Sequence, residues 1–112
     1  MDCIFCSIIK GEIPCQKVYE NDRCYAFRDI NPQAPVHVII VPKVHIQSVQ
    51  HINAENSVYV SAIFEAIPVI AEQLGLGSGY RVISNCGEDG GQTVPHLHFH
   101  LLGGAKLGEK IL

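Results

Sequence analysis

The sequence has no excess of positive charge and no long hydrophobic run, and these two absences exclude several classes of protein. Its 112 residues carry 8 Lys and Arg against 11 Asp and Glu, whereas a protein that binds long nucleic acids needs a basic surface. No apolar stretch approaches the ~20 residues of a transmembrane helix, and the N-terminus lacks the basic segment of a secretory signal. We therefore expect a cytoplasmic protein that binds neither membranes nor nucleic acid polymers, although backbone amides and histidines could still hold a single nucleotide.

The sequence also lacks internal repeats, low-complexity segments and linkers. Hydrophobic residues make up 47% of it, which is too many for a disordered chain and enough for a core. We therefore expect one domain over residues 1–112. The five cysteines are an odd number, and in a reducing compartment Cys3 and Cys6 at C-x-x-C spacing indicate metal ligands or a redox pair before they indicate a disulfide.

Apolar periodicity and turn residues predict an α+β fold. They indicate a short helix over 3–10 ended by Gly11, and one long helix over 54–74, capped by Asn53 and kinked at Pro68. The long helix ends at Gly75 or Gly77, and its apolar stripe is expected in the core: Val60, Ile63, Phe64, Ile67, Ile70, Ala71 and Leu74. Strands are expected over 17–20, 24–30, 37–41, 80–85 and 96–101. Short connections between strands favour an antiparallel sheet of about five strands with the helices on one face.

Three histidines alternate with large apolar residues from position 96 to position 101. In a strand, His96, His98 and His100 would share one face, and the apolar residues between them would face the core. A histidine-bearing surface strand is the alternative, but strict alternation favours a functional row. Glycines at 87, 90 and 91 precede this segment, and a glycine-rich loop can direct several N–H groups at an anion.

These residues together indicate phosphoryl chemistry. A neutral imidazole such as His98 can attack phosphorus if its other nitrogen is protonated and held by an acceptor. His100 and His37 could donate to phosphoryl oxygens, although His37 alone could equally be a core histidine. Asp29 follows a predicted strand, and its carboxylate could accept both hydroxyls of a ribose, unless it is simply a solvated turn residue.

A second group of residues suggests a metal site. Cys3 and Cys6 with His45 and His96 are the ligand types of a closed, tetrahedral zinc site. The competing redox interpretation is weaker because no strand precedes the pair. Cys15, Cys24 and Cys86 have no recognisable partner in the sequence, and we expect them to pack as small apolar side chains.

The segment Gly91-Gln92-Thr93 followed by His96-Leu97-His98-Phe99-His100-Leu101-Leu102 resembles the signature of the histidine triad (HIT) superfamily. The resemblance extends along almost the whole chain, through Cys-Ile-Phe-Cys, Phe-x-Asp-Ile, Pro-Gln-Ala-Pro-x-His and Pro-Lys-x-His, in the order shown by its nucleotide-binding branch. It implies that His98 attacks the α-phosphorus to form a nucleotidyl-histidine, which water hydrolyses. His100 and His37 match residues that contact the phosphate and support the nucleophile.

The resemblance also implies the remaining site residues and the assembly. The phosphate and leaving group would be contacted by Asn85, Gly91, Gln92 and Thr93, the ribose by Asp29, and the base by Ile4, Phe5, Ile8, Phe27 and Ile30. One structural zinc per chain would be held by Cys3, Cys6, His45 and His96, with no organic cofactor. A homodimer is implied, joined through the long helix and an edge strand so that the sheet continues across both chains.

The triad ends in Gly103-Gly104, as in the phosphoramidase-like branch, but residues 105–112 lack the Trp-Pro-Pro ending found there. We therefore expect a hydrolase of purine nucleoside 5'-phosphoramidates that releases the nucleoside monophosphate. A diadenosine polyphosphate hydrolase, a nucleotidyl transferase and a non-catalytic nucleotide-binding module are the alternatives.

Overall fold

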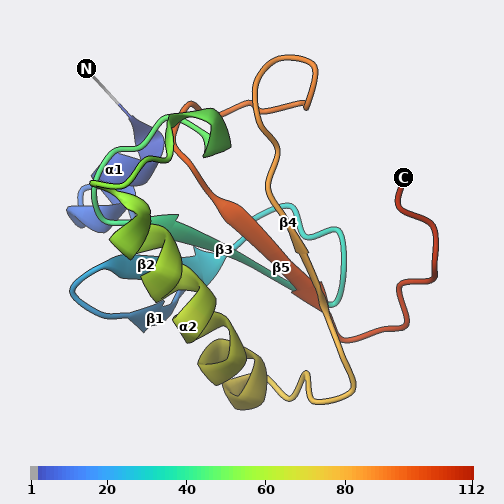
Figure 1. Ribbon diagram of the computed structural model, residues 1–112. Helices are drawn as coiled ribbons and strands as arrows, with labels where there is room; N and C mark the ends of the chain where they lie inside the picture. Colours follow the sequence, from blue (N-terminus) through green and yellow to red (C-terminus); the bar gives the residue numbers. More distant parts are fainter. Residues whose placement is uncertain (1–2) are drawn as a thin grey trace.

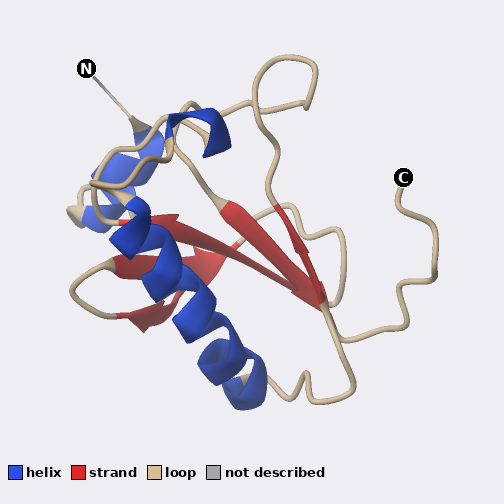
Figure 2. Ribbon diagram, in the orientation of Figure 1, coloured by secondary structure: helices blue, strands red, loops and turns tan. Residues whose placement is uncertain are grey.

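Five strands form an antiparallel sheet in the spatial order β1-β2-β3-β5-β4 (Figures 1 and 2). The computed structural model describes residues 3–112. Its elements along the chain are α1 (Ile4–Ile9), β1 (Lys17–Glu20), β2 (Cys24–Arg28), β3 (Val36–Pro42), the 3-10 helix η1 (Val49–His51), α2 (Ser57–Gln73), β4 (Arg81–Ile83) and β5 (Phe99–Gly103). The α+β class and the five-stranded antiparallel sheet predicted from the sequence are confirmed. No helix within residues 3–112 is long and apolar enough to span a membrane.

The most apolar segment of the chain, β3, lies at the centre of the sheet and pairs with both β2 and β5. Its side chains alternate between two buried faces. Val38 and Ile40 belong to the cluster beneath α2, whereas Ile39 and Val41 pack with Phe5 and other residues of α1. The two helices therefore cover opposite faces, and the expectation that both lie on one face is wrong.

Helix α2 lies across one face of the sheet (Figure 1), where it buries a stripe of small and branched side chains. The stripe includes Ile63, Ile67 and Ile70, as predicted, but Phe64 is 49% exposed and only its edge meets Phe99, at a centroid distance of 5.2 Å. The helix begins at Ser57 rather than at 54.

The late start of α2 has a local cause. The side-chain oxygen of Asn53 accepts hydrogen bonds from the amides of Glu55 and Asn56, so that Asn53 caps a turn before the helix rather than the helix itself. Gly75, at φ 73°, follows the last turn, in agreement with its predicted role as a terminator.

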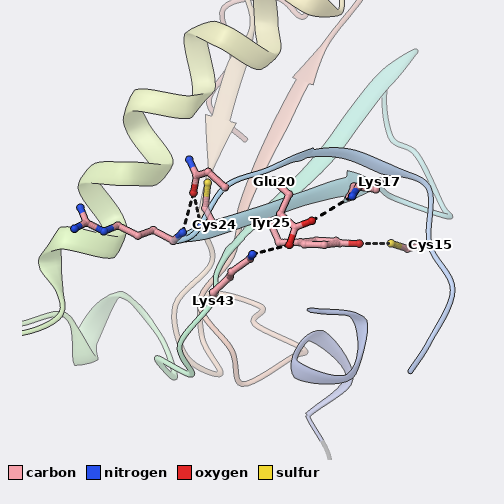
Figure 3. Close-up of polar contacts among 8 residues, drawn as sticks. Cys15, Lys17, Glu20, Cys24, Tyr25 and Lys43 are labelled. Carbon is pink, nitrogen blue, oxygen red and sulfur yellow. Dashed lines mark hydrogen bonds and ion pairs between the residues drawn. The ribbon is translucent and has the colours of Figure 1, made fainter. Parts of the chain in front are cut away.

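Polar contacts hold the β1–β2 hairpin against the start of the loop after β3 (Figure 3). Glu20 pairs with Lys43 at 2.6 Å and with Lys17 at 3.2 Å, and these hydrogen bonds, Lys43 first, lower the pKa of its carboxyl. Cys15 lies 3.5 Å from the Tyr25 hydroxyl, a partner that the sequence did not reveal. This contact, together with burial, raises the pKa of Tyr25 to about 12.

The histidine segment is only partly a strand. Strand β5 begins at Phe99 and ends at Gly103, so the expected strand over 96–101 starts three residues too early. The reason is a change of partner: the amide of Leu97 bonds to the carbonyl of Ile46, which lies beyond the end of β3. His96 and His98 are thus positioned by the loop that follows β3, and His100 by the sheet.

Candidate active site

His98 lies buried between α1 and the start of β5. Its ring meets the edge of Phe5 at a centroid distance of 5.0 Å, and only 6% of the residue is exposed. Its Nδ1 is 2.7 Å from the carbonyl oxygen of His96. Because a carbonyl only accepts, Nδ1 carries the ring proton and Nε2 keeps its lone pair. The hydroxyl of Ser84 donates to the His98 carbonyl at 2.8 Å, and this bond also fixes the backbone of His98 itself.

His37 and His100 form a direct pair beside His98. In the β3–β5 register His100 lies opposite Ile39, and His37 is two residues from Ile39, so both side chains lie on the α1 face. His37 Nε2 is 2.8 Å from His100 Nδ1, and the His98 and His100 rings are 5.1 Å apart. Burial first, then the neighbouring His98 and His37, lowers the pKa of His100, which favours its neutral form at pH 7.

Asp29 closes this group at the rim. One carboxylate oxygen accepts from the amide of Asn31 at 2.7 Å, and the other is 3.4 Å from His37 Nε2. Asp29, His37 and His100 lie close enough to hold a cation, but the amide of Gln33 donates to His37 Nδ1 at 3.0 Å. Neutral His37 must then be protonated on Nε2, the nitrogen that faces the group, and a protonated nitrogen cannot ligate a metal. The group is therefore a hydrogen-bonded cluster.

Of the residues expected around the base, three are buried and two are exposed. Phe5, Ile8 and Phe27 are buried in one cluster, with Phe5 and Phe27 edge to face at 5.6 Å. Ile4 is 49% exposed and Ile30 is 92% exposed. Of these five residues, Ile30 alone lines a cavity of about 510 Å³. The lining of this cavity consists of Pro14, Cys15, Gln16, Arg28, Asp29 and Ile30.

The glycine-rich loop before the triad is held by the side chain of Gln92. Its carbonyl oxygen accepts from the amide of Gly87 at 2.9 Å, and its amide nitrogen donates to the carbonyls of Gln47 and Val94. Gly87 and Gly91 have φ values of 74° and 79°, which other residues adopt at a cost. The predicted phosphate residues Asn85 and Thr93 lie on either side of this loop, half-buried and exposed respectively.

Gly90 in this loop is expected to tolerate no side chain. A Cβ there would lie 2.4 Å from the carbonyl oxygen of Cys86, which is backbone and cannot rotate away. Gly90→Ala should therefore destabilise the protein by about 1–3 kcal/mol and raise the KM for a nucleotide substrate. Gly77→Ala is the matched control because a Cβ at Gly77 meets nothing within 4 Å. Urea unfolding and steady-state kinetics measure both effects, and equal behaviour of the two variants would contradict the expectation.

A second cluster joins the N-terminal helix to the triad. Cys3 Sγ is 3.2 Å from His96 Nδ1, and Cys6 Sγ is 3.6 Å from the same atom and 3.5 Å from His45 Nδ1. In a tetrahedral zinc site, a sulfur and a nitrogen ligand are about 3.5 Å apart. The four residues thus fit zinc in both type and spacing.

The protonation state and the tautomer of His96 are also those that a metal-binding histidine needs. Burial lowers its pKa to about 4, so that the imidazole is neutral at pH 7. Its Nε2 is 3.2 Å from the carbonyl oxygen of Pro42, which places the ring proton there and turns the lone pair of Nδ1 toward the sulfurs. All five cysteines of the sequence are free thiols, and burial and Cys3 raise the pKa of Cys6.

A further cavity lies elsewhere. It has a volume of about 710 Å³ and lies between the segment after α2 and the C-terminal tail, where Arg81 donates to the carbonyl of Gly108 at 2.7 Å. This cavity shares no residue with the histidine groups, and the chemistry of the described residues is concentrated around His98 instead.

Several groups that orient the histidines of the site could not be recognised from the sequence. The His96 and Pro42 carbonyls and the Gln33 amide are backbone atoms, which every residue or nearly every residue has. Ser84 could have been found only as a polar residue in a predicted strand. By contrast, every predicted metal ligand and all three proposed catalytic histidines come together as expected.

The site therefore consists of a buried, oriented imidazole beside a histidine pair, preceded in the chain by a glycine-rich loop. Comparison with known proteins identifies the family. The model of the HIT domain matches residues 10–107, and the chain belongs to the HIT family.

Relatives agree with this assignment. A HIT family hydrolase from Clostridium thermocellum has a TM-score of 0.96 and 53% sequence identity, over 99% of this chain and 97% of that one. The purine nucleoside phosphoramidase of Escherichia coli (strain K12) is 45% identical over 96% of this chain and 91% of its own. An uncharacterized HIT-like protein of Synechococcus elongatus is 49% identical over 95% and 93%. These comparisons support a hydrolase.

Proposed function

We propose that the protein hydrolyses purine nucleoside 5'-phosphoramidates to the nucleoside monophosphate through a covalent nucleotidyl-His98 intermediate. The observation that carries this proposal is the 2.7 Å contact between His98 Nδ1 and the His96 carbonyl, which leaves Nε2 as a free nucleophile. The relative named purine nucleoside phosphoramidase supports the choice of substrate class.

The reaction follows from these positions. His98 Nε2 attacks the α-phosphorus, the bond from phosphorus to the substrate nitrogen breaks, and the amine leaves with a proton taken from solvent. Water then attacks the phosphorus and gives up a proton to solvent, the bond to Nε2 breaks, and the nucleoside monophosphate is released. A donor from His100 offsets the negative charge that grows on the phosphoryl oxygens.

The remaining site residues would bind the nucleotide. Asp29 accepts from the ribose hydroxyls, and the loop groups Asn85, Gly91, Gln92 and Thr93 contact the phosphate. The base rests on the buried Phe5, Ile8 and Phe27, and the exposed Ile4 and Ile30 close over it, which would explain the position of two such large apolar side chains in solvent.

Two structural features complete the proposal. Zinc bound by Cys3, Cys6, His45 and His96 would be structural, because four protein ligands leave no open position. A homodimer would form through α2 and β4, since Phe64 is half exposed on α2 and β4 has a strand partner on one side only.

A comparison of substrates tests the function. We expect the purified protein to release AMP from adenosine 5'-phosphoramidate with a larger kcat/KM than from diadenosine polyphosphates. A larger kcat/KM for the polyphosphates would instead identify the alternative hydrolase. Binding of AMP without turnover of either substrate would contradict an enzymatic function and favour a nucleotide-binding module.

A further inference from the structure

The hydrogen bonds around His37 determine which of its nitrogens carries a proton. The amide of Gln33 lies 3.0 Å from His37 Nδ1, and an amide N–H can only donate. Nδ1 must therefore accept, and the proton of neutral His37 is on Nε2. Asp29 reinforces this arrangement, because its carboxylate oxygen, 3.4 Å from Nε2, favours a proton on that side.

The state of His37 in turn determines that of His100. His37 Nε2 carries a proton and lies 2.8 Å from His100 Nδ1, so Nδ1 of His100 accepts. Neutral His100 then carries its proton on Nε2, the nitrogen turned away from His37. The chain of donors thus runs from the Gln33 amide through two imidazoles and ends in an N–H group on His100.

The segment that holds the Gln33 amide is braced at several points. The Asn31 amide donates to Asp29 at 2.7 Å, and the Gln33 side chain donates to the Asn31 carbonyl at 3.2 Å. Pro32 and Pro35 restrict the backbone on either side. The turn is therefore rigid enough to hold one amide against one imidazole nitrogen.

We propose that the backbone N–H of Gln33 is a positioning group that fixes both tautomers, so that His100 presents an N–H donor to a phosphoryl oxygen of the substrate. The inference rests on the proposed function, which supplies the phosphoryl group. With the opposite tautomers, the lone pair of His100 Nε2 would face the anionic oxygen. The hydrogen-bond donor would be lost and replaced by repulsion, and in enzymes generally the loss of one donor that stabilises the transition state costs about 10²–10³-fold in kcat.

A pair of substitutions at one position separates the amide from the side chain. Gln33→Pro removes the N–H, whereas Gln33→Ala keeps it and removes the exposed side chain together with its hydrogen bond to the Asn31 carbonyl. Since Pro can also disturb the turn, an ester bond in place of the amide at residue 33, introduced by semisynthesis, provides a second variant that deletes only the N–H. Long-range proton–nitrogen NMR spectra of the imidazoles report the tautomers directly.

We expect Nε2–H for His37 and His100 in the unaltered protein and in Gln33→Ala. In the ester and Gln33→Pro proteins, both imidazoles should shift toward Nδ1–H, and kcat for the phosphoramidate should fall at least about tenfold with a smaller change in KM. Unchanged tautomers in the ester protein, or Nδ1–H on His100 in the unaltered protein, would overturn the inference. The spectra need no substrate, so failure of this relay is distinguishable from absence of hydrolysis.

Discussion

Replacement of His98 with Ala should lower kcat for hydrolysis of adenosine 5'-phosphoramidate by at least about 10⁴-fold. His98 Nε2 is the atom that forms the bond to phosphorus in the proposed reaction, and its neighbour His100 cannot take its place because the Nδ1 of His100 is engaged by His37 at 2.8 Å. Steady-state release of AMP measures the loss. Acid quenching after mixing should trap the nucleotidyl protein with the unaltered chain and none with the variant.

The control for this substitution is His51→Ala. His51 is exposed, and among residues 3–112 its ring forms a hydrogen bond with the Ser48 hydroxyl alone, at 2.8 Å, so its loss should leave kcat unchanged. Binding of AMP to His98→Ala verifies that the site remains folded. Full turnover by His98→Ala, or a trapped nucleotidyl group on another residue, would contradict the assignment of the nucleophile.

The predictable part of the fold is the part that depends on local patterns. The apolar run over 37–41 predicts a central strand because both of its faces must be buried, and β3 is that strand. Periodicity also predicts that the segment over 3–10 is helical. It indicates that a helix buries one side, but not which face of the sheet that side meets, so the placement of α1 and α2 on opposite faces could not be predicted.

The candidate site was predictable where it consists of side chains of distinctive chemistry. His98, His100 and His37 meet as expected, and His96 leaves the row to join the cysteines, because Leu97 pairs with Ile46 rather than with β3. Tautomers could not be predicted. They are determined by an amide at Gln33 and a carbonyl at His96, and backbone atoms acquire such roles only through the tertiary fold.

The N-terminal helix connects the cysteine cluster to the proposed nucleophile, His98. Phe5 lies between Cys3 and Cys6 in the sequence, and its ring packs edge-on against both His96, at 5.9 Å, and His98, at 5.0 Å. The His96 carbonyl orients His98 while the His96 ring faces the sulfurs. A metal bound by the four proposed ligands would therefore fix both the backbone and the packing that hold the imidazole of His98.

Removal of that metal should consequently affect both stability and activity. We expect about one zinc per chain by elemental analysis of protein prepared without chelators. Because a metal present at about 1,000 times its Kd stabilises the folded state by ~4 kcal/mol, treatment with a chelator should lower the Tm by about 15 °C. It should also lower kcat about tenfold, since the His96 carbonyl loses its support. Readdition of zinc should restore both values.

Substitution of one proposed zinc ligand distinguishes the effect of losing the metal site from the effect of losing any thiol. Cys3→Ser should reproduce the lower Tm in untreated protein and make it insensitive to chelators, because the sulfur that lies 3.2 Å from His96 is gone. Cys15→Ser is the matched control: the hydrogen-bond partner of its sulfur is the Tyr25 hydroxyl, which a serine hydroxyl can also bond. Zinc-free protein with an unchanged Tm and kcat would contradict the metal site, and would reduce Cys3 and Cys6 to packing thiols that hold α1 against His96.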